Sequence, residues 1–158
     1  MIRIVTESMS DFTQEEAKAA DLIVMPLPIR FGMEEYWDDG VSLTQDDFYA
    51  RLRVAKELPK TSQVPVEHYR KCFNRLLENP EDEVLVITGS SKLSGCYQSA
   101  CIAREACHDP ARVTVLDSLN ATCAEYMLVD QALRYRREGV SDMQTMLAKL
   151  CLLYTSPS

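Results

Sequence analysis

The chain has 158 residues and a formal net charge of −7, with 46% hydrophobic and 26% charged residues. This length suits one domain of ordinary size, and the balance of apolar and charged residues excludes a disordered protein. The 24 acidic residues outnumber the 17 basic ones, which leaves no electrostatic basis for nucleic-acid binding. No apolar run approaches the roughly 20 residues of a membrane-spanning helix, so we expect a protein that does not span a membrane.

The first third of the chain predicts a strand, a helix and a second strand. Residues 2–6 form a β-rich run that ends in a polar loop at residues 8–11. Thr13 and Glu16 make a capping box that begins a helix. Residues 22–29 are apolar, but their two prolines cannot donate ladder hydrogen bonds, so this strand is short or lies at a sheet edge.

Two helices are predicted in the middle of the chain. Thr44 caps the first, whose Phe48, Tyr49 and Leu52 side chains we expect to face inward. Pro65 suits the first turn of the second helix, since its missing N–H would be unpaired there. Apolar residues recur on this second helix at spacings of three and four and predict one buried stripe: Tyr69, Cys72, Phe73, Leu76 and Leu77.

The second half of the chain repeats the alternation of strand and helix. Residues 84–88 are a continuous aliphatic run, typical of a parallel strand covered on both faces. The loop 89–95 leads to a helix, residues 112–116 form another strand, and a longer helix ends at Gly139. Ser141 caps a last helix. This alternation predicts an α/β fold in three layers (α/β/α) with a mostly parallel sheet.

The cysteines are not spaced as a zinc site or a disulfide framework. They contain no C-x2-C pair, and the chain has two histidines, His68 and His108. We therefore expect reduced, packed thiols in a cytoplasmic protein, with no metal site and no cofactor. Cys96 differs from the others because it lies at a junction of loop and helix, where a thiolate can be stabilised.

Ligands of open α/β sheets bind beyond the carboxyl ends of the strands. Four polar loops leave or flank such ends here, and together they supply hydroxyls and a helix N-terminus, which are neutral donors suited to an anion. The candidate residues of these loops are Ser8, Ser10, Thr61, Ser62, Ser91, Ser94, Gly95, Asp117 and Ser118. The alternative is that these serines and threonines merely cap helices. Neither a nucleophile elbow nor a P-loop is present in this set.

Several motifs within these loops resemble those of the DegV family of bacterial fatty-acid-binding proteins. The similarity runs from Ile2 to about Leu150, and its most specific motif is S-S-x-L-S-G-x-Y-Q-S-A at residues 90–100. The supporting motifs are Ser-x-Ser-Asp at 8–11, Pro-Leu through Phe-Gly at 26–32, Thr-Ser-Gln at 61–63 and Val-Leu-Asp-Ser at 115–118. The chain departs from the family pattern at Glu7, Met9 and Cys96, where Asp, a small residue and Thr are usual.

The resemblance implies a fatty-acid carrier. Members hold one long-chain fatty acid in a tunnel between two domains, with its carboxylate on hydroxyls at the positions of Thr61 and Ser94. Gly95 lets backbone N–H groups approach the same carboxylate. In several bacteria such a carrier presents the carboxylate to a separate ATP-dependent fatty acid kinase, which makes an acyl phosphate. The resemblance therefore implies a binding subunit with no turnover of its own.

The domain organisation follows from the same resemblance. We expect residues 1–150 to be an N-terminal domain of this type, residues 151–158 to be a non-native tail, and the family's C-terminal domain to be absent. Two other functions stay open. One is a small-molecule kinase or phosphotransferase domain like those of dihydroxyacetone kinases, which ATP turnover would reveal. The other is an interaction module without a ligand, against which copurified lipid would argue.

Overall fold

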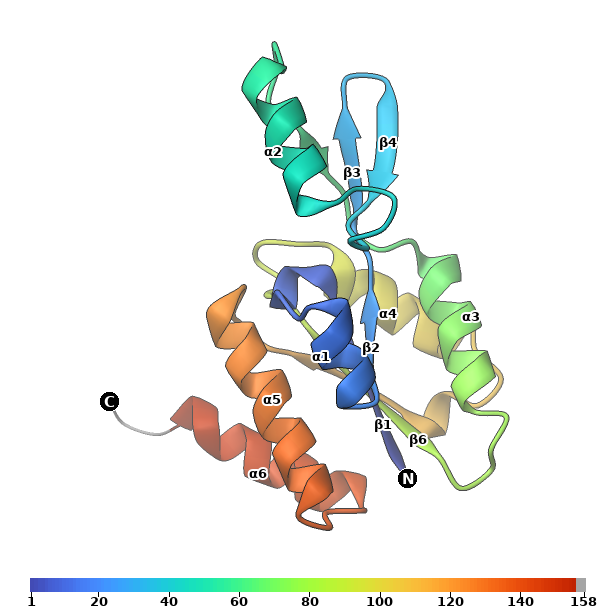
Figure 1. The fold of residues 1–158 in the computed structure, drawn as a ribbon. Coiled ribbons are helices and arrows are strands. Elements are labelled where there is room, and N and C mark those ends of the chain that lie inside the picture. Colours follow the sequence, from blue (N-terminus) through green and yellow to red (C-terminus); the bar gives the residue numbers. More distant parts are fainter. Residues whose placement is uncertain (156–158) are drawn as a thin grey trace.

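Four parallel strands form the main sheet of the computed structural model, which describes residues 1–155 (Figure 1). The strand order is β2-β1-β6-β7, and each of the three pairings is parallel. The bounds of the strands are Ile2–Glu7 for β1, Leu22–Met25 for β2, Glu83–Thr88 for β6 and Val113–Asp117 for β7. The predicted strands at residues 2–6, 84–88 and 112–116 are therefore confirmed. β2, which ends before Pro26, is short and lies at the sheet edge, as predicted for the run 22–29.

Helices cover both faces of this sheet. α3 (Val66–Leu76) and α4 (Cys96–Glu105) pack on one face, and α1 (Gln14–Ala19), α5 (Cys123–Arg137) and α6 (Met143–Thr155) pack on the other (Figure 1). β6 serves both layers, because its alternate side chains point to opposite faces. Its two buried valines join the α3–α4 core, whereas its leucine and isoleucine join the α5–α6 core. The expected three-layer α/β fold is confirmed.

A small antiparallel sheet, which the sequence analysis did not predict, projects from the main body (Figure 1). Its order is β4-β3-β5, with bounds Glu34–Trp37 for β4, Pro28–Phe31 for β3 and Lys60–Thr61 for β5. The apolar run predicted as one strand at residues 22–29 is divided between the two sheets. The division lies at Pro26 and Leu27, because Pro26 has no N–H to continue the ladder of β2.

α2 (Gln45–Val54) lies beside this small sheet and has no buried residue. Phe48 makes an edge-to-face contact with Phe31, with ring centroids 5.7 Å apart, but it is only half-buried. Tyr49 is 49% exposed. The prediction that α2 turns its apolar side chains into a core is therefore wrong for Tyr49, because a three-stranded sheet this short offers little surface to cover.

The predicted helix ends are largely confirmed. Thr13 accepts a hydrogen bond from the N–H of Glu16 at 3.2 Å, and Glu16 accepts one from the N–H of Thr13 at 2.9 Å. Gly139 follows α5 in the left-handed region at φ +96°. The last helix is capped by Asp142 rather than by Ser141, because the Asp142 carboxylate accepts from the N–H of Thr145 at 2.8 Å.

α6 continues through Thr155, and so includes part of the segment expected to be a non-native tail. Residues 156–158 of that segment lie outside the described residues, and the boundary at residue 150 stays a prediction. Within the part of the chain that the structure describes, no helix combines the length and the apolar character needed to cross a membrane.

Two short 3-10 turns complete the chain path, η1 (Ser8–Ser10) and η2 (Pro110–Arg112).

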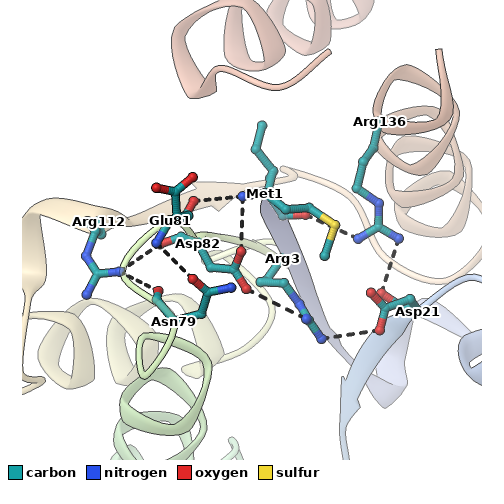
Figure 2. A network of polar contacts seen from close by, with 9 residues as sticks. Met1, Arg3, Asp21, Asn79, Glu81, Asp82, Arg112 and Arg136 are labelled. Carbon is teal, nitrogen blue, oxygen red and sulfur yellow. Dashed lines mark hydrogen bonds and ion pairs between the residues drawn. The ribbon is translucent and has the colours of Figure 1, made fainter. Parts of the chain in front are cut away.

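The amino ends of the strands are held by a polar network (Figure 2). Arg3 contacts Asp21 at 3.2 Å and Asp82 at 3.8 Å. Arg112 donates to the carbonyls of Leu77, Asn79 and Asp82, each at 3.0 Å. Arg136 donates to the carbonyls of Ile2, Ala20 and Asp21.

Candidate functional site

Three loops at the carboxyl ends of the strands are bound to one another. The N–H of Ser118, after β7, donates to the carbonyl of Thr88 at the end of β6, at 3.0 Å. The N–H of Ser90 donates to the carbonyl of Asn120 at 2.7 Å, and the N–H of Thr122 donates to the carbonyl of Met9 at 3.1 Å. The structure therefore brings together the loops that follow β1, β6 and β7.

The loop that carries Thr61 lies against the N-terminus of α4. A Cβ added at Gly95 would lie 3.1 Å from the Gln63 side chain, closer than an ordinary contact, so the two segments approach closely at this glycine. The N–H of Val64 donates to the Cys96 sulfur at 3.4 Å. The segments of Thr61 and Ser94, which are distant in sequence, are thereby placed side by side.

Thr61 and Ser94 differ in how far their hydroxyls are already engaged. Ser94 is half-buried, and its Oγ accepts from the N–H of Cys96, the first residue of α4, at 3.2 Å; an accepting hydroxyl can still act as a donor. Thr61 is exposed in β5, paired with Ile29, and its hydroxyl makes no hydrogen bond within residues 1–155. Gly95 is exposed where α4 begins. Two hydroxyl donors and a helix N-terminus therefore lie at one corner of the surface.

The other candidate hydroxyls serve mainly to hold the loops. Buried Ser10 donates to the carbonyl of Glu7 at 2.7 Å, and Ser8 accepts from the N–H of Leu27 at 3.1 Å. Buried Ser118 both donates to the carbonyl of Asn120 and accepts from its N–H, each at 3.1 Å.

Of the last three candidates, Asp117 contacts the loops through its carboxylate, whereas Ser91 and Ser62 do so through their backbone N–H groups. Asp117 accepts from the N–H of Ser91 at 3.2 Å and from that of Leu119 at 2.9 Å. Ser91 and Ser62 are exposed, and the N–H of Ser62 donates to the carbonyl of Pro28 at 3.2 Å. These contacts fix the loops around Thr61 and Ser94.

A pair of buried carboxyl groups beneath these loops was missed by the sequence analysis. Glu7 ends β1, Glu125 lies in the first turn of α5, and both are 0% exposed. Burial raises the pKa of Glu7 to about 7 and that of Glu125 to about 9, and the Glu7 charge adds to the shift at Glu125. The sequence offered one indication that Glu7 is buried: it directly follows the β-rich run at residues 2–6, and the structure buries almost all of that strand.

The expectation of a stabilised thiolate at Cys96 is wrong. Cys96 is completely buried, and burial raises the pKa of its thiol, because the low dielectric disfavours the charged form. Cys72, Cys96 and Cys107 are buried, whereas Cys123 and Cys151 are exposed, so the thiols are less uniformly packed than expected. Within residues 1–155, no three His, Cys, Asp or Glu side chains are grouped to hold a metal ion.

Two surface depressions lie away from the candidate hydroxyls. One, of about 350 Å³, is lined by Met25, His68, Lys71, Cys72 and Arg75, mostly from α3. The other, of about 420 Å³, lies between the β3–β4 hairpin and the end of α2. Neither is lined by Thr61 or Ser94, so in this chain those donors form an open corner rather than part of either depression.

Comparison with known proteins identifies the family of this chain. A family model described as "uncharacterised protein, DegV family" matches residues 1–153. A DegV domain-containing protein of Caldanaerobacter subterraneus is 39% identical over 140 residues, which are 89% of this chain and 49% of that protein. A fatty acid-binding protein of Thermotoga maritima is 33% identical over 156 residues, covering 94% of this chain and 51% of that protein.

Solved structures of DegV family proteins have the same fold as this chain. A stearic acid-binding protein of Eubacterium ventriosum has a TM-score of 0.86 and 30% identity, over 95% of this chain and 52% of that one. A DegV family protein of Thermus thermophilus, described for its fatty acid binding, has a TM-score of 0.85 and 32% identity, over 96% of this chain and 52% of that one. The chain thus spans about half the length of these relatives, which are named as binding proteins rather than as enzymes. It belongs to the DegV family.

Proposed function

We propose that this chain is the carboxylate-binding part of a fatty-acid carrier. The single observation that carries the proposal is the placement of the Thr61 loop against the N-terminus of α4, where Ser94 and Gly95 lie. The Thr61 and Ser94 hydroxyls donate to the carboxylate, and the positive end of the α4 dipole favours its charge. Relatives whose names state stearic acid or fatty acid binding support this ligand class.

The acyl chain needs more apolar cover than an open corner supplies. Burying about fourteen methylenes gains roughly 11 kcal/mol, at about 0.8 kcal/mol for each CH2. Covering only half of the chain would forfeit several kcal/mol, or about a thousandfold in affinity. The proposal therefore includes a second domain that covers the acyl chain, of the kind for which the greater length of the relatives leaves room.

The carrier has no turnover of its own in this proposal. It holds a long-chain fatty acid in the cytoplasm and presents the carboxylate to a separate fatty acid kinase, which makes the acyl phosphate. No cofactor takes part in binding. ATP turnover by the purified chain would instead favour the small-molecule kinase alternative, and a purified protein that takes up no lipid would favour the interaction module.

The test is binding of 13C-carboxyl oleate to the protein that includes the proposed second domain, as wild type, Thr61→Val and Ser94→Ala, followed by NMR of the carboxyl carbon. A hydrogen bond to a charged group contributes about 1.5–3 kcal/mol, so we expect each variant to bind at least about tenfold more weakly. Ser141→Ala is the matched control, since Ser141 is an exposed hydroxyl before α6, outside the candidate loops. Equal affinity of wild type, Thr61→Val and Ser94→Ala would contradict the assignment.

A further inference from the structure

The two buried carboxyl groups differ in their hydrogen-bond partners. Glu7 accepts on both oxygens, from the N–H of Gly89 at 2.6 Å and from the Tyr69 hydroxyl at 3.4 Å. Glu125 accepts on Oε1 from the Thr6 hydroxyl at 3.2 Å. Its buried Oε2 has no hydrogen-bond partner in the described part of the chain. A buried acceptor without a partner is costly, but the same oxygen can carry a proton and become a donor.

The unpartnered oxygen of Glu125 faces the same small space as the Glu7 carboxylate. A Cβ added at Gly89 would lie 3.1 Å from Glu7 Oε1 and 3.1 Å from Glu125 Oε2, so these two oxygens lie within about 6 Å of one another. Two carboxylates that close in a buried site cannot both ionise without strong repulsion. One member of the pair must therefore be neutral in the packed structure.

Among residues 1–155, no positively charged group is found to act on the pair and offset a second negative charge. The other titratable groups that act on it are Tyr69 from α3, Cys96 from α4, Asp117 at the end of β7, and Asp11 after η1. Each of these is either neutral or negative. Repulsion between two ionised glutamates would thus act with little compensation.

We propose that Glu125 carries a proton on Oε2 beside an ionised Glu7, and that this half-protonated pair positions the Gly89–Gly95 loop. Glu7 is the ionised member because both of its oxygens accept hydrogen bonds, whereas Glu125 Oε2 accepts none. Burial and the Glu7 charge place the pKa of Glu125 above that of Glu7, in agreement with this order.

Hydrogen bonds connect the pair to the proposed ligand donors. Glu7 holds the N–H of Gly89, the first residue after β6. The carbonyl and hydroxyl of Ser90 accept from the N–H groups of Ser94 and Lys92, at 3.0 and 3.3 Å. When Glu125 releases its proton to solvent, repulsion from Glu7 therefore acts at the start of the loop that ends in Ser94. The consequence for lipid binding rests on the proposed function; the protonation state does not.

The protonation state is measured by 13C NMR of the chain labelled at the glutamate carboxyl carbons, titrated from pH 4 to 10. We expect two carbons to titrate near pH 7 and pH 9, far above the remaining glutamates. In Glu125→Gln the upper transition disappears, and in Glu7→Gln the Glu125 transition moves down because the neighbouring charge is gone. Titration of every glutamate carbon below pH 6 would overturn the proposal.

Positioning of the loop is measured by millisecond hydrogen-exchange pulses at pH 9.5. Glu125→Gln keeps the neutral shape of the protonated acid, so its Gly89 and Ser90 amides stay protected. We expect about tenfold faster exchange in wild type than in Glu125→Gln, the effect of one pKa unit of interaction. Glu57→Gln, a change at an exposed glutamate, serves as the control and should match wild type. Equal protection in wild type and Glu125→Gln would overturn the positioning role.

Oleate binding separates this inference from the proposed function. We expect wild type to lose affinity by about tenfold between pH 7 and 9.5, and Glu125→Gln to keep it. Absence of oleate binding at every pH would contradict the proposed function alone. The carboxyl titration and the ratio of exchange rates would still show whether Glu125 is protonated. A parallel loss of affinity in both proteins would contradict the link between the pair and the ligand.

Discussion

The two ends of the main sheet are built from opposite chemistry. At the amino ends of the strands, arginines are paired with carboxylates and backbone carbonyls, as Figure 2 shows for Arg3, Arg112 and Arg136. At the carboxyl ends, two buried glutamates meet hydroxyls and backbone N–H groups, and the charged groups that act on them are acidic. The amino end is electrically balanced and suits stability. The carboxyl end keeps unbalanced charge and open donors, the properties of a site that responds to a ligand.

The largest expected effect of a single substitution at the carboxyl end is that of Gly89→Ala. Its new Cβ would lie 2.7 Å from the Met9 sulfur and 3.1 Å from both glutamate carboxyls. Overpacking of this kind costs about 1–3 kcal/mol, and we expect the upper part of that range in chemical denaturation. The double variant Met9→Ala with Gly89→Ala should recover part of the loss, whereas strictly additive losses would show that Met9 is not the obstacle.

At the amino end, Arg112→Ala should lower the free energy of unfolding by about 1.5–3 kcal/mol. The change leaves the partly buried carbonyls of Leu77 and Asp82, and the exposed carbonyl of Asn79, without their charged donor. Arg134→Ala is the matched control, because Arg134 makes only an exposed ion pair with Asp130, at 3.0 Å on the same helix, for which about 0.5 kcal/mol is expected. An equal decrease of the free energy of unfolding in the two variants would show that the Arg112 network stabilises the fold no more than a surface ion pair does.

The pH dependence of stability distinguishes the two ends further. The pKa values of Glu7 and Glu125 are raised from 4.5 to about 7 and about 9, so the folded state binds more protons than the unfolded chain between those limits. Their contribution is complete below about pH 4.5 and is lost as the pH rises through 7 and then 9. Each proton contributes a slope of at most about 1.4 kcal/mol per pH unit.

Urea denaturation at several pH values measures this loss. Glu125→Gln should flatten the decline between pH 7 and 9, because the amide cannot ionise. The control Glu57→Gln should follow wild type. A stability that rises from pH 6 to 9 in wild type would contradict the raised pKa values.

The smallest effect is expected in the projecting unit of α2 and the small sheet. Tyr49 is half-exposed and contacts the Phe48 ring at a centroid distance of 5.5 Å. Tyr49→Ser should change the free energy of unfolding by no more than about 0.5 kcal/mol, the usual range for surface substitutions. A loss of about 2 kcal/mol or more, the size expected for emptying a core site, would show that α2 packs more closely than its exposure indicates.

The main sheet was predictable because its strands are runs rich in β-branched and aliphatic residues that alternate with segments of helical pattern. The small sheet was missed because its strands are only two to four residues long. A signal was nevertheless present. Phe31 pairs with Glu34, so Gly32 and Met33 form a two-residue hairpin loop, with Gly32 at φ +60°. Glycine in such a loop between two short β-rich runs is typical of a hairpin.

The candidate site was predictable in part. The Ser94 loop was found because parallel strands place their carboxyl ends at one edge. Thr61 lies instead in β5 of the antiparallel small sheet and was singled out, together with Ser94, by the resemblance to the DegV family. The structure brings these two segments together. The carboxyl pair was not found, because only the folded chain brings Glu7 of β1 next to Glu125 of α5. Cys96 was misjudged for a related reason: a loop-to-helix junction in the sequence does not reveal that the side chain points into the core.

The most direct test of the account is a crystal structure of the protein with oleate bound. We predict the carboxylate within hydrogen-bond distance of Thr61 Oγ1 and Ser94 Oγ, at the N-terminus of α4. A carboxylate held instead in the depression lined by His68, Lys71 and Arg75 would contradict the account, because that depression lies on α3 and does not include Thr61 or Ser94.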